Sequence, residues 1–295
     1  MKKIVVLGAT GMAGHMISSY FKTLLQKYEV YDICHTVKLE EKSILLDIHD
    51  LDSLKKIIAG LKPDIIINSI GILNKNAEDD PSNTIFINSY FPRYLEEQFK
   101  NTNIRLIQIS TDCVFSGDKG NYDEAFVPDG KDLYAKTKIL GEINNNKDLT
   151  VRTSIIGPEL KHNGTGLFHW FMKQNDTAIG YSKVIWSGVT TLQLGKCLDL
   201  MIENNLNGLY NLTSKVPISK YELLKLLNSV FDKSILIKSS EQIENDKSLI
   251  STREDFSVDL PDYKEMLSEL RDWMVENRQL YSQYFFNTCG GNLYV

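Results

Sequence analysis

The sequence predicts an α/β fold: a doubly wound parallel sheet with a small C-terminal lobe. Short apolar runs at 4–7, 65–67 and 104–109 alternate with segments of helical periodicity, which is the order of strands and crossover helices in a parallel sheet. Glycine or small polar residues follow each run, as expected at the carboxyl ends of such strands. Beyond residue 158 the sequence becomes richer in aromatic side chains, which indicates a separate lobe.

The strongest motif lies in the first fifteen residues. The apolar run 4–7 is followed by Gly8, Gly11 and Gly14, and then by a pattern of helical period from Met16. A strand, a glycine turn and a helix form the context of a dinucleotide-binding fingerprint, because the glycines permit a tight turn, a close approach to the pyrophosphate and close helix packing. Free N–H groups at the helix start would bind the phosphates. We therefore assign this turn to a cofactor site: Gly8, Thr10, Gly11, Met12, Ala13 and Gly14.

The composition argues against several classes of protein. The 295 residues carry a net charge of −5 with scattered Lys and Arg, so we expect no nucleic-acid partner. The four cysteines are far apart and the five histidines lack metal-ligand spacing, which predicts a reduced, cytoplasmic protein with no metal. No apolar run reaches membrane-spanning length, so we expect no membrane contact.

The chain is long enough for a main domain and a smaller lobe. We expect residues 1–158 to form a Rossmann-type NAD(P)-binding domain, to which a strand and a helix return near 189–213. Residues 159–188 and 214–280 would form the substrate-binding lobe. Residues 281–295 would form a C-terminal tail, and the sequence leaves open whether this tail docks on the chain or belongs to a subunit contact.

The second strand is expected to end near Cys34, where an NAD site usually places an acid on the adenosine ribose. Here His35 follows and Asp32 lies inside the strand, which favours NADP; NAD stays open because a shift of two residues would put Asp32 on the ribose. A third short strand ends at Asp47. We assign His35, Asp47 and Ile48 to the cofactor site, with Asp47 against the adenine; a plain loop cap is the alternative for Asp47.

Two further strands end in polar residues. The run 65–67 leads into Asn68, Ser69 and Gly71, and the run 104–109 leads into Ser110, Thr111 and Asp112. Doubly wound sheets keep their chemistry at the carboxyl ends of strands. The alternative interpretation is that Ser110 and Thr111 only cap a turn.

A predicted helix, 133–144, carries Tyr134 and Lys138 four residues apart, so both share one helical face. A free tyrosine has a pKa near ~10, and a neighbouring ammonium would lower it and so make proton transfer easier. The lysine can also hold a ribose hydroxyl. The same spacing recurs at Tyr221 and Lys225, but no comparable strand end precedes it, so we interpret that copy as an ordinary amphipathic helix.

Six segments follow one another along the chain: GATGMAG at 8–14, PDIIINSIG at 63–71, Asn88, STDCVFSG at 110–117, YAKTKILGE at 134–142 and VRTSIIGP at 151–158. In this order they resemble the extended short-chain dehydrogenase/reductase family, and within it the branch of dTDP-4-dehydrorhamnose reductase and related sugar-nucleotide reductases. The resemblance covers about half of the chain strongly and the C-terminal lobe loosely.

The resemblance implies three catalytic residues. Thr111 would hydrogen-bond the substrate carbonyl, Tyr134 would protonate its oxygen as hydride arrives, and Lys138 would bind the nicotinamide ribose and tune Tyr134. The cofactor path would also include residues at the strand ends: Asn68, Ser69, Gly71, Ser110, Ser154 and Ile156.

The resemblance also implies a nucleotide-sugar substrate that lies between the lobes. The substrate contacts would come from both lobes: Thr111, Cys113, Val114, Phe168, Trp186, Thr191 and, near the diphosphate, Arg253. For the lobe residues a second interpretation stays open, since an aromatic side chain in a lobe is more often core and an arginine is more often a solvated surface charge.

The implied activity is the NAD(P)H-dependent reduction of a 4-keto group on a nucleotide-activated deoxy sugar, in the synthesis of surface polysaccharide precursors. The related 4,6-dehydratases carry Asp-Glu after the catalytic threonine, whereas this chain has Asp112 and Cys113, which argues against dehydration. A nucleotide-sugar epimerase with tightly bound NAD(P) stays an alternative, and so does a non-catalytic member like the regulatory subunit of methionine adenosyltransferase. A homodimer is an expectation at the level of the family.

Overall fold

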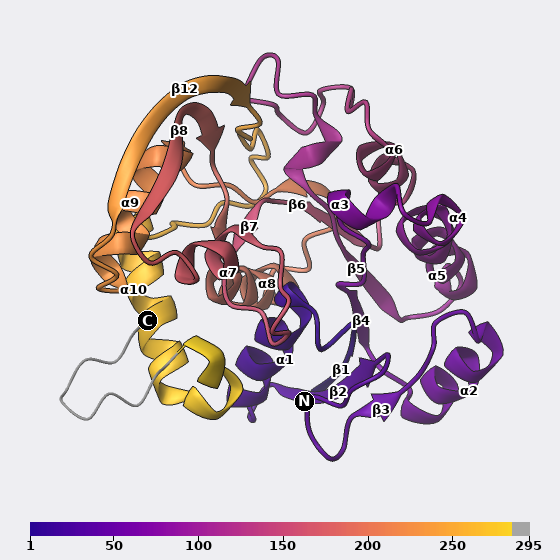
Figure 1. Cartoon of the computed structure of the whole chain (residues 1–295). Helices are drawn as coiled ribbons and strands as arrows, with labels where there is room; N and C mark the ends of the chain where they lie inside the picture. Colours follow the sequence, from indigo (N-terminus) through magenta and orange to yellow (C-terminus); the bar gives the residue numbers. More distant parts are fainter. Residues whose placement is uncertain (285–295) are drawn as a thin grey trace.

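The computed structural model describes residues 1–284, apart from the side chains of residues 74 and 75. A seven-stranded parallel sheet lies between two layers of helices (Figure 1), which confirms the predicted doubly wound fold. The strand order is β10-β6-β5-β4-β1-β2-β3, so the order reverses between β1 and β4, where such sheets bind their ligands. The bounds are β1 Lys2–Leu7, β2 Tyr28–Cys34, β3 Ile44–Leu45, β4 Ile65–Asn68, β5 Arg105–Ile109, β6 Leu149–Arg152 and β10 Gly208–Asn211.

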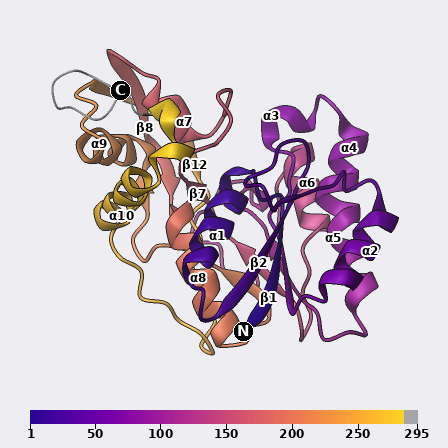
Figure 2. The same ribbon diagram turned by 90° about the horizontal axis from the view of Figure 1, so that it is seen from below.

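Strand β1 supplies side chains to the cores on both faces of the sheet. Ile4 and Val6 pack into the core that includes α1 and α8, while Val5 and Leu7 pack into the core that includes α2 and α5. This alternation explains why the strand is apolar throughout, since both of its faces are buried. Figure 2 shows the two helical layers on opposite sides of the sheet. The helices are α1 Met12–Thr23, α2 Leu51–Leu61, α5 Phe91–Phe99, α6 Leu133–Leu140 and α8 Thr191–Glu203.

The sequence predicts one helix over 86–100, but the structure divides this region. It forms α4 (Pro81–Ile85), a π-helical turn η1 (Phe86–Tyr90) and α5, after the short helix α3 (Asn74–Ala77). Pro92 has no N–H to donate to the Asn88 carbonyl, which frees that carbonyl inside the helix. Gly141 packs against it so closely that a Cβ there would lie 2.0 Å from the Asn88 oxygen. Helix α6 ends at Leu140, directly before Gly141 and four residues before the predicted end at residue 144.

The second lobe is built on a small sheet of order β11-β8-β12, which lies apart from the main sheet (Figure 1). Strand β12 runs over 11 residues, although the sequence predicts a strand only over 235–237, and its partner β8 is not predicted at all. Both strands are long but largely polar or half-exposed, so neither shows the apolar alternation that marks a strand. The bounds are α7 Leu167–Met172, β8 Thr177–Trp186, β11 Ile218–Ser219, α9 Lys220–Val230, β12 Leu236–Asp246 and α10 Tyr263–Glu276.

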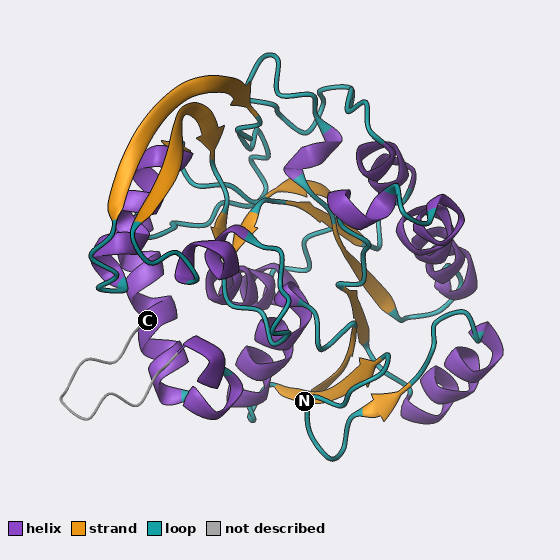
Figure 3. Cartoon of the chain, in the orientation of Figure 1, coloured by secondary structure: helices purple, strands orange, loops and turns teal. Residues whose placement is uncertain are grey.

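Short helices, loops and a third sheet of β7 and β9 complete the fold. The loop between η2 and α6 runs without a helix or a sheet strand (teal in Figure 3). The described part of the tail docks on the chain, since Tyr281 contacts His15 and Tyr284 contacts Phe168. Residues 285–295 of the predicted tail lie outside the described residues. The remaining elements are η2 Asp112–Val114, β7 Ile155–Ile156, β9 Val189–Thr190, η3 Arg278–Leu280 and η4 Ser282–Tyr284.

Within residues 1–284, no helix combines the length and the apolar character needed to cross a membrane.

Candidate functional site

The glycine turn joins the carboxyl end of β1 to α1. Gly8 has a φ of +80°, a backbone angle that residues other than glycine rarely adopt. Its carbonyl accepts a 2.9 Å hydrogen bond from the Gly11 N–H. A Cβ on Gly14 would lie 2.1 Å from the Gly8 oxygen, so α1 packs directly on the turn. The helix begins at Met12, and the N–H groups of its first turn therefore point at the switch point of the sheet.

The end of β4 and the loop after it cover this turn, and the side chains of Asn68 and Ser69 are bound within the protein. Ser69 Oγ donates a 2.6 Å hydrogen bond to the Leu7 carbonyl, and Asn68 Nδ2 donates a 2.8 Å bond to Gln108 Oε1. Asn68 and Ser69 therefore position the loop, and the exposed backbone of Gly71 is the part that can meet a ligand.

Asn88 connects this loop to α6, and sequence reasoning gave it no role. Its Nδ2 donates bonds of 3.0 Å to the Ile72 carbonyl and 3.2 Å to Thr137 Oγ1, while its Oδ1 accepts a 2.9 Å bond from the Ile72 N–H. A Cβ on Gly71 would lie 3.5 Å from Asn88 Oδ1 and 4.0 Å from Lys138 Nζ. The available signal was a polar residue inside an apolar helical stretch with a proline four positions later.

Helix α6 brings Tyr134 and Lys138 to the carboxyl end of β5. The Asp132 side chain caps the helix by accepting a 2.7 Å hydrogen bond from the Ala135 N–H. Tyr134 and Lys138 are only 7% and 5% exposed. Lys138 Nζ donates a 2.8 Å bond to the Ile109 carbonyl, at the last residue of β5. Burial lowers the pKa of Lys138 to about 8, although the Glu142 carboxylate acts to raise it.

The predicted lowering of the Tyr134 pKa by Lys138 is wrong for this structure. Burial raises the pKa of Tyr134 well above its ordinary value, and the charges of Cys113 and Asp112 raise it further, while a hydrogen bond with Thr111 acts in the opposite direction. Desolvation of the phenolate outweighs any neighbouring cation. Tyr134 is therefore a neutral phenol at neutral pH, which is the form that can donate a proton.

The hydroxyl groups of Ser110 and Thr111 have different hydrogen-bond partners. Ser110 Oγ donates a 2.7 Å hydrogen bond to Glu142, whose carboxylate also accepts bonds of 2.8 and 2.7 Å from Arg152. Ser110 therefore belongs to a buried network behind the site rather than to the cofactor surface. Thr111 Oγ1 accepts a 3.1 Å bond from the Cys113 N–H and stays within reach of Tyr134.

At the adenosine end, β2 ends at Cys34, as the sequence predicts. Asp32 is buried in an ion pair with Lys22, so its carboxylate faces α1 and is not available to a ribose. His35 and Asp47 are 69% and 56% exposed in their side chains, and His35 Nε2 lies 3.9 Å from Asp47 Oδ2. The structure brings these two predicted residues together, while the neighbouring Ile48 is buried.

Two more residues of the predicted cofactor set lie at β7. Ile156 is buried and pairs with Thr190 of β9. The Ser154 carbonyl accepts a 2.9 Å hydrogen bond from the Val189 N–H, so its backbone is bound within the small β7-β9 sheet. Their predicted contact with a nicotinamide stays a prediction.

Most residues of the predicted substrate set are buried in the cores or lie away from the site. Val114, Phe168 and Thr191 have no exposed surface and pack in the cores, so their side chains cannot touch a substrate. Arg253 lies at the amino end of β10, where it pairs with Asp255 and donates bonds of 3.0 and 2.9 Å to the carbonyls of residues 207 and 209. That end of the sheet is opposite the carboxyl ends of the strands, so a role for Arg253 at a diphosphate does not fit.

Cys113 and Trp186 do lie near the site. Burial raises the pKa of the Cys113 thiol to about 12, so it stays neutral and cannot replace a glutamate as a base at neutral pH. The Trp186 ring is almost fully buried, but its centroid lies 4.9 Å from Lys220 Nζ. The Asp112 carboxylate, next to Thr111, acts to raise the pKa of Lys220, while burial lowers it to about 8.

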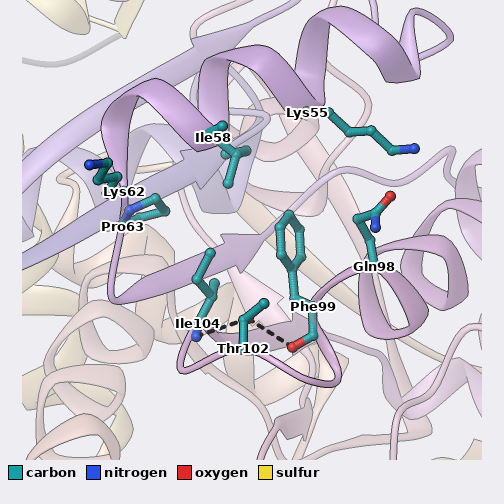
Figure 4. A pocket seen from close by; sticks show the side chains of 9 residues that line it. Lys55, Ile58, Lys62, Pro63, Gln98, Phe99, Thr102 and Ile104 are labelled. Carbon is teal, nitrogen blue, oxygen red and sulfur yellow. Dashed lines mark hydrogen bonds between the residues drawn. The ribbon is translucent and has the colours of Figure 1, made fainter.

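Two cavities stand out in the described part of the chain. One of about 910 Å³ lies between α7, β8, α9 and β12, and Lys220 is part of its wall. The other, of about 400 Å³, lies between α2 and α5; Figure 4 shows Lys55, Phe99 and Thr102 around it. Pro63 and Ile104 line this second cavity just before β4 and β5 begin, so it is at the amino ends of the strands and away from the site. Among residues 1–284, no group of three or more His, Cys, Asp or Glu side chains could hold a metal ion.

Comparison with known proteins identifies the family. A family model described as the RmlD substrate binding domain matches residues 1–232, which is more than half of the chain. The chain belongs to this family. The match of this RmlD-family chain includes the glycine turn, Thr111, Tyr134 and Lys138, and ends just after α9.

Two curated relatives differ in how much of their length is matched. The chain is 27% identical to methionine adenosyltransferase 2 subunit beta of Xenopus tropicalis over 154 residues, which are 51% of this chain and 45% of that protein. The match thus spans less than half of the relative. The chain is 26% identical to dTDP-4-dehydrorhamnose reductase of Aggregatibacter actinomycetemcomitans over 257 residues, 82% of this chain and 83% of that one.

The fold of the RmlD-family chain is also found among solved structures. The dTDP-4-dehydrorhamnose reductase of Bacillus anthracis, solved in complex with NADP, matches with a TM-score of 0.79 and 21% identity, over 92% of this chain and 99% of that chain. At this identity the likeness supports the fold.

Proposed function

We propose that this RmlD-family chain is an NAD(P)H-dependent reductase that acts on the 4-keto group of a nucleotide-activated deoxy sugar. The observation that carries the proposal is a series of close approaches across the switch point of the sheet. Gly8 and Gly14 contact Ser69 and its loop, Gly71 approaches Lys138, and Lys138 is bound to the end of β5. Thr111 and Tyr134 follow directly beside it.

The residues present fit a nicotinamide dinucleotide. The first turn of α1 offers free N–H donors beside glycines that leave room for a pyrophosphate, and Gly11 has only one atom within 4 Å of the position of a Cβ. Lys138 offers an ammonium group next to the exposed backbone of Gly71, where a ribose hydroxyl would accept a hydrogen bond. The bound cofactor would supply the hydride, which goes to the carbonyl carbon of the sugar.

The chain's own residues then have distinct tasks. The Thr111 hydroxyl orients the carbonyl oxygen of the substrate towards Tyr134. Tyr134 gives its phenolic proton to that oxygen, so that the carbonyl becomes a hydroxyl group, and the raised pKa keeps this proton in place until it is needed. Lys138, in its protonated form, holds the ribose hydroxyl.

We further propose that NADP is preferred over NAD. The supporting observations are the sequestered carboxylate of Asp32 and the exposed imidazole of His35 at the end of β2. An exposed histidine leaves room for the 2′-phosphate of NADP, whereas a carboxylate beside the ribose would repel that phosphate. The carboxylate of Asp47, 3.9 Å from His35, opposes this preference.

The deciding experiment follows the absorbance of NADPH with a panel of dTDP-, UDP- and GDP-linked 4-keto-6-deoxy sugars, with NADH in parallel. We expect oxidation with at least one sugar and a higher kcat/KM for NADPH than for NADH. A protein that binds the dinucleotide but oxidises it with no sugar would contradict the reductase. If that protein also retains its cofactor through purification, an epimerase becomes the better assignment.

A non-catalytic role is the second candidate, and the similarity to a methionine adenosyltransferase subunit favours it. A regulator of that kind does not need an intact proton donor. Here the three residues Thr111, Tyr134 and Lys138 are all present and lie together, which supports the enzyme.

A further inference from the structure

Residues 278–284, the end of the described chain, form a strap of the two short turns η3 and η4 beside α1 (Figure 1). The strap docks through its two tyrosines, since Tyr281 is 0% exposed and Tyr284 is 2% exposed. The family model ends at residue 232, so the match to the family gives the strap no role. A buried tyrosine needs a polar partner for its hydroxyl, and the partners here show what the strap holds.

Tyr281 is connected to the glycine turn through His15. The Tyr281 hydroxyl lies 3.2 Å from His15 Nε2, and Nδ1 of the same ring lies 2.8 Å from the Gly11 carbonyl. A neutral imidazole has one N–H, and it is needed at Nδ1 because a carbonyl can only accept. Tyr281 therefore donates to Nε2 and fixes the tautomer of His15 that holds Gly11, directly before the start of α1.

Tyr284 makes a similar contact with the second lobe. Its hydroxyl lies 2.7 Å from His169 Nδ1 on α7 and accepts a 3.1 Å hydrogen bond from the Glu159 N–H. The other ring nitrogen of His169 lies 3.2 Å from the His162 carbonyl, so Nε2 carries the proton and Nδ1 accepts from Tyr284. The Tyr284 ring also packs edge-on against Phe168, with 5.4 Å between the ring centroids. One hydroxyl thus binds both α7 and the loop before it.

The loop that Tyr284 holds lies against the start of α1. Glu159 Oε1 accepts a 2.6 Å hydrogen bond from the Gly166 N–H, which ties the two ends of the loop 159–166 together. A Cβ on Gly166 would lie 3.3 Å from Met12 Sδ, at the first residue of α1. The strap is therefore connected to the first turn of α1 by two routes, one through His15 and one through this loop.

We propose that Tyr281 and Tyr284 are positioning residues of the cofactor site: the docked strap holds the glycine turn and the loop 159–166 in the arrangement that binds the dinucleotide. This inference rests on the proposed function for the identity of that ligand. Docking of the strap and binding of NADP⁺ then strengthen each other, because each orders the segments that the other needs.

Undocking of the strap would release both routes. His15 Nε2 would lose its donor, and the competing tautomer would turn a lone pair of Nδ1 towards the Gly11 carbonyl, which repels it. The loop 159–166 would lose its bonds to Tyr284. The cofactor would then have to order both segments as it binds, so its affinity would fall. By reciprocity, docking raises the affinity for NADP⁺ by the same factor by which NADP⁺ favours docking.

The first measurement is hydrogen–deuterium exchange of the full chain with and without saturating NADP⁺. The amides of Leu280, Tyr281 and Tyr284 report docking, because each donates a hydrogen bond to a carbonyl of residues 277–281 at the strap. We expect NADP⁺ to slow their exchange at least about fivefold, the lower end of typical couplings between two sites. The amides of β12, an edge strand of the second lobe, should not change.

The second measurement is the Kd for NADP⁺ of variants that lack one hydroxyl. Tyr281→Phe and Tyr284→Phe keep their rings and should each raise the Kd at least about twofold, and the double variant should raise it about fivefold or more. The matched control is Tyr263→Phe on α10, whose buried hydroxyl donates a 3.3 Å bond to the Trp186 carbonyl, outside both routes. The melting temperature should fall in all three single variants, whereas the Kd should change only in the two strap variants.

Two results would each overturn the proposal. One is strap amides whose exchange NADP⁺ does not slow, and the other is a Kd of the double variant within about twofold of the parent, even where its melting temperature falls. A parent that binds no NADP⁺ would refute this proposal together with the cofactor site. A parent that binds NADP⁺ but oxidises NADPH with no sugar would refute the reductase alone, since neither measurement needs a sugar.

Discussion

The hydroxyl of Tyr281 donates a hydrogen bond to Nε2 of His15, with 3.2 Å between the two atoms, across 266 positions of the chain. The donor can be assigned because Nδ1 of the same ring lies 2.8 Å from the Gly11 carbonyl and so carries the proton of the neutral imidazole. The described end of the chain is thus joined to the helix that follows the glycine turn, through a histidine that is completely buried.

The first prediction concerns acid stability. Burial lowers the pKa of His15 from 6.5 to about 4, so between these pH values the unfolded chain binds a proton that the folded chain does not. Stability conferred by neutral His15 is therefore complete above pH 6.5 and is lost as the pH falls towards 4, by up to about 3 kcal/mol. Urea unfolding at pH 7, 5.5 and 4 should show a smaller pH dependence for His15→Gln than for the parent. The exposed His162→Gln should follow the parent, and equal pH dependence in the parent and His15→Gln would contradict the prediction.

The second prediction compares two glycines. Gly14→Ala should destabilise the fold by about 1–3 kcal/mol and weaken NADPH binding at least about tenfold, because its Cβ would lie 2.1 Å from a backbone oxygen. Gly60→Ala, in α2, meets nothing within 4 Å and should stabilise by about 0.5–1 kcal/mol. Thermal melting and titration with NADPH measure both effects. Normal NADPH affinity in Gly14→Ala would show that the turn does not bind the cofactor.

The first half of the fold could be predicted from the sequence because its signals are local. The buried strand 4–7, the glycines 8–14 and the helix 51–61 each follow from apolar periodicity, turn chemistry or a capping residue such as Asp50. The position of Tyr134 and Lys138 on one helix also follows from spacing alone.

The rest depends on contacts between distant residues. Strand β8 is stabilised by pairing with β12, some sixty residues later, and neither sequence has a strong alternation. The π-helical turn that presents Asn88 requires Gly141 to approach its carbonyl, which no local pattern encodes. Phe168 is an aromatic residue of a type that often contacts ligands, but the fold buries it completely in the core.

The third prediction concerns the pH dependence of cofactor binding. Burial lowers the pKa of Lys138 to about 8, and the ammonium that would hold the ribose exists only below that pH. The affinity for NADPH should therefore fall about tenfold or more as the pH rises from 7 to 9.5, since a hydrogen bond to a charged group is lost. Fluorescence titration across this range measures the effect. Lys138→Arg keeps its charge and should give a flatter profile, whereas a flat profile in the parent would argue against this role of Lys138.

The fourth prediction distinguishes the two copies of the Tyr-x-x-x-Lys spacing. Tyr134→Phe removes the proton donor from a ring that is 7% exposed and leaves its shape intact, so the Kd for NADPH and the melting temperature should stay close to those of the parent. Turnover of the keto sugar should fall ~100-fold or more, because the phenylalanine ring has no proton to give to the carbonyl oxygen that Thr111 orients. Tyr221→Phe, on α9 beside Lys225, is the matched control and should retain full turnover. Since both substitutions delete a single hydroxyl, a loss confined to Tyr134→Phe assigns the proton transfer to that oxygen, and equal activity of the two variants would disprove it.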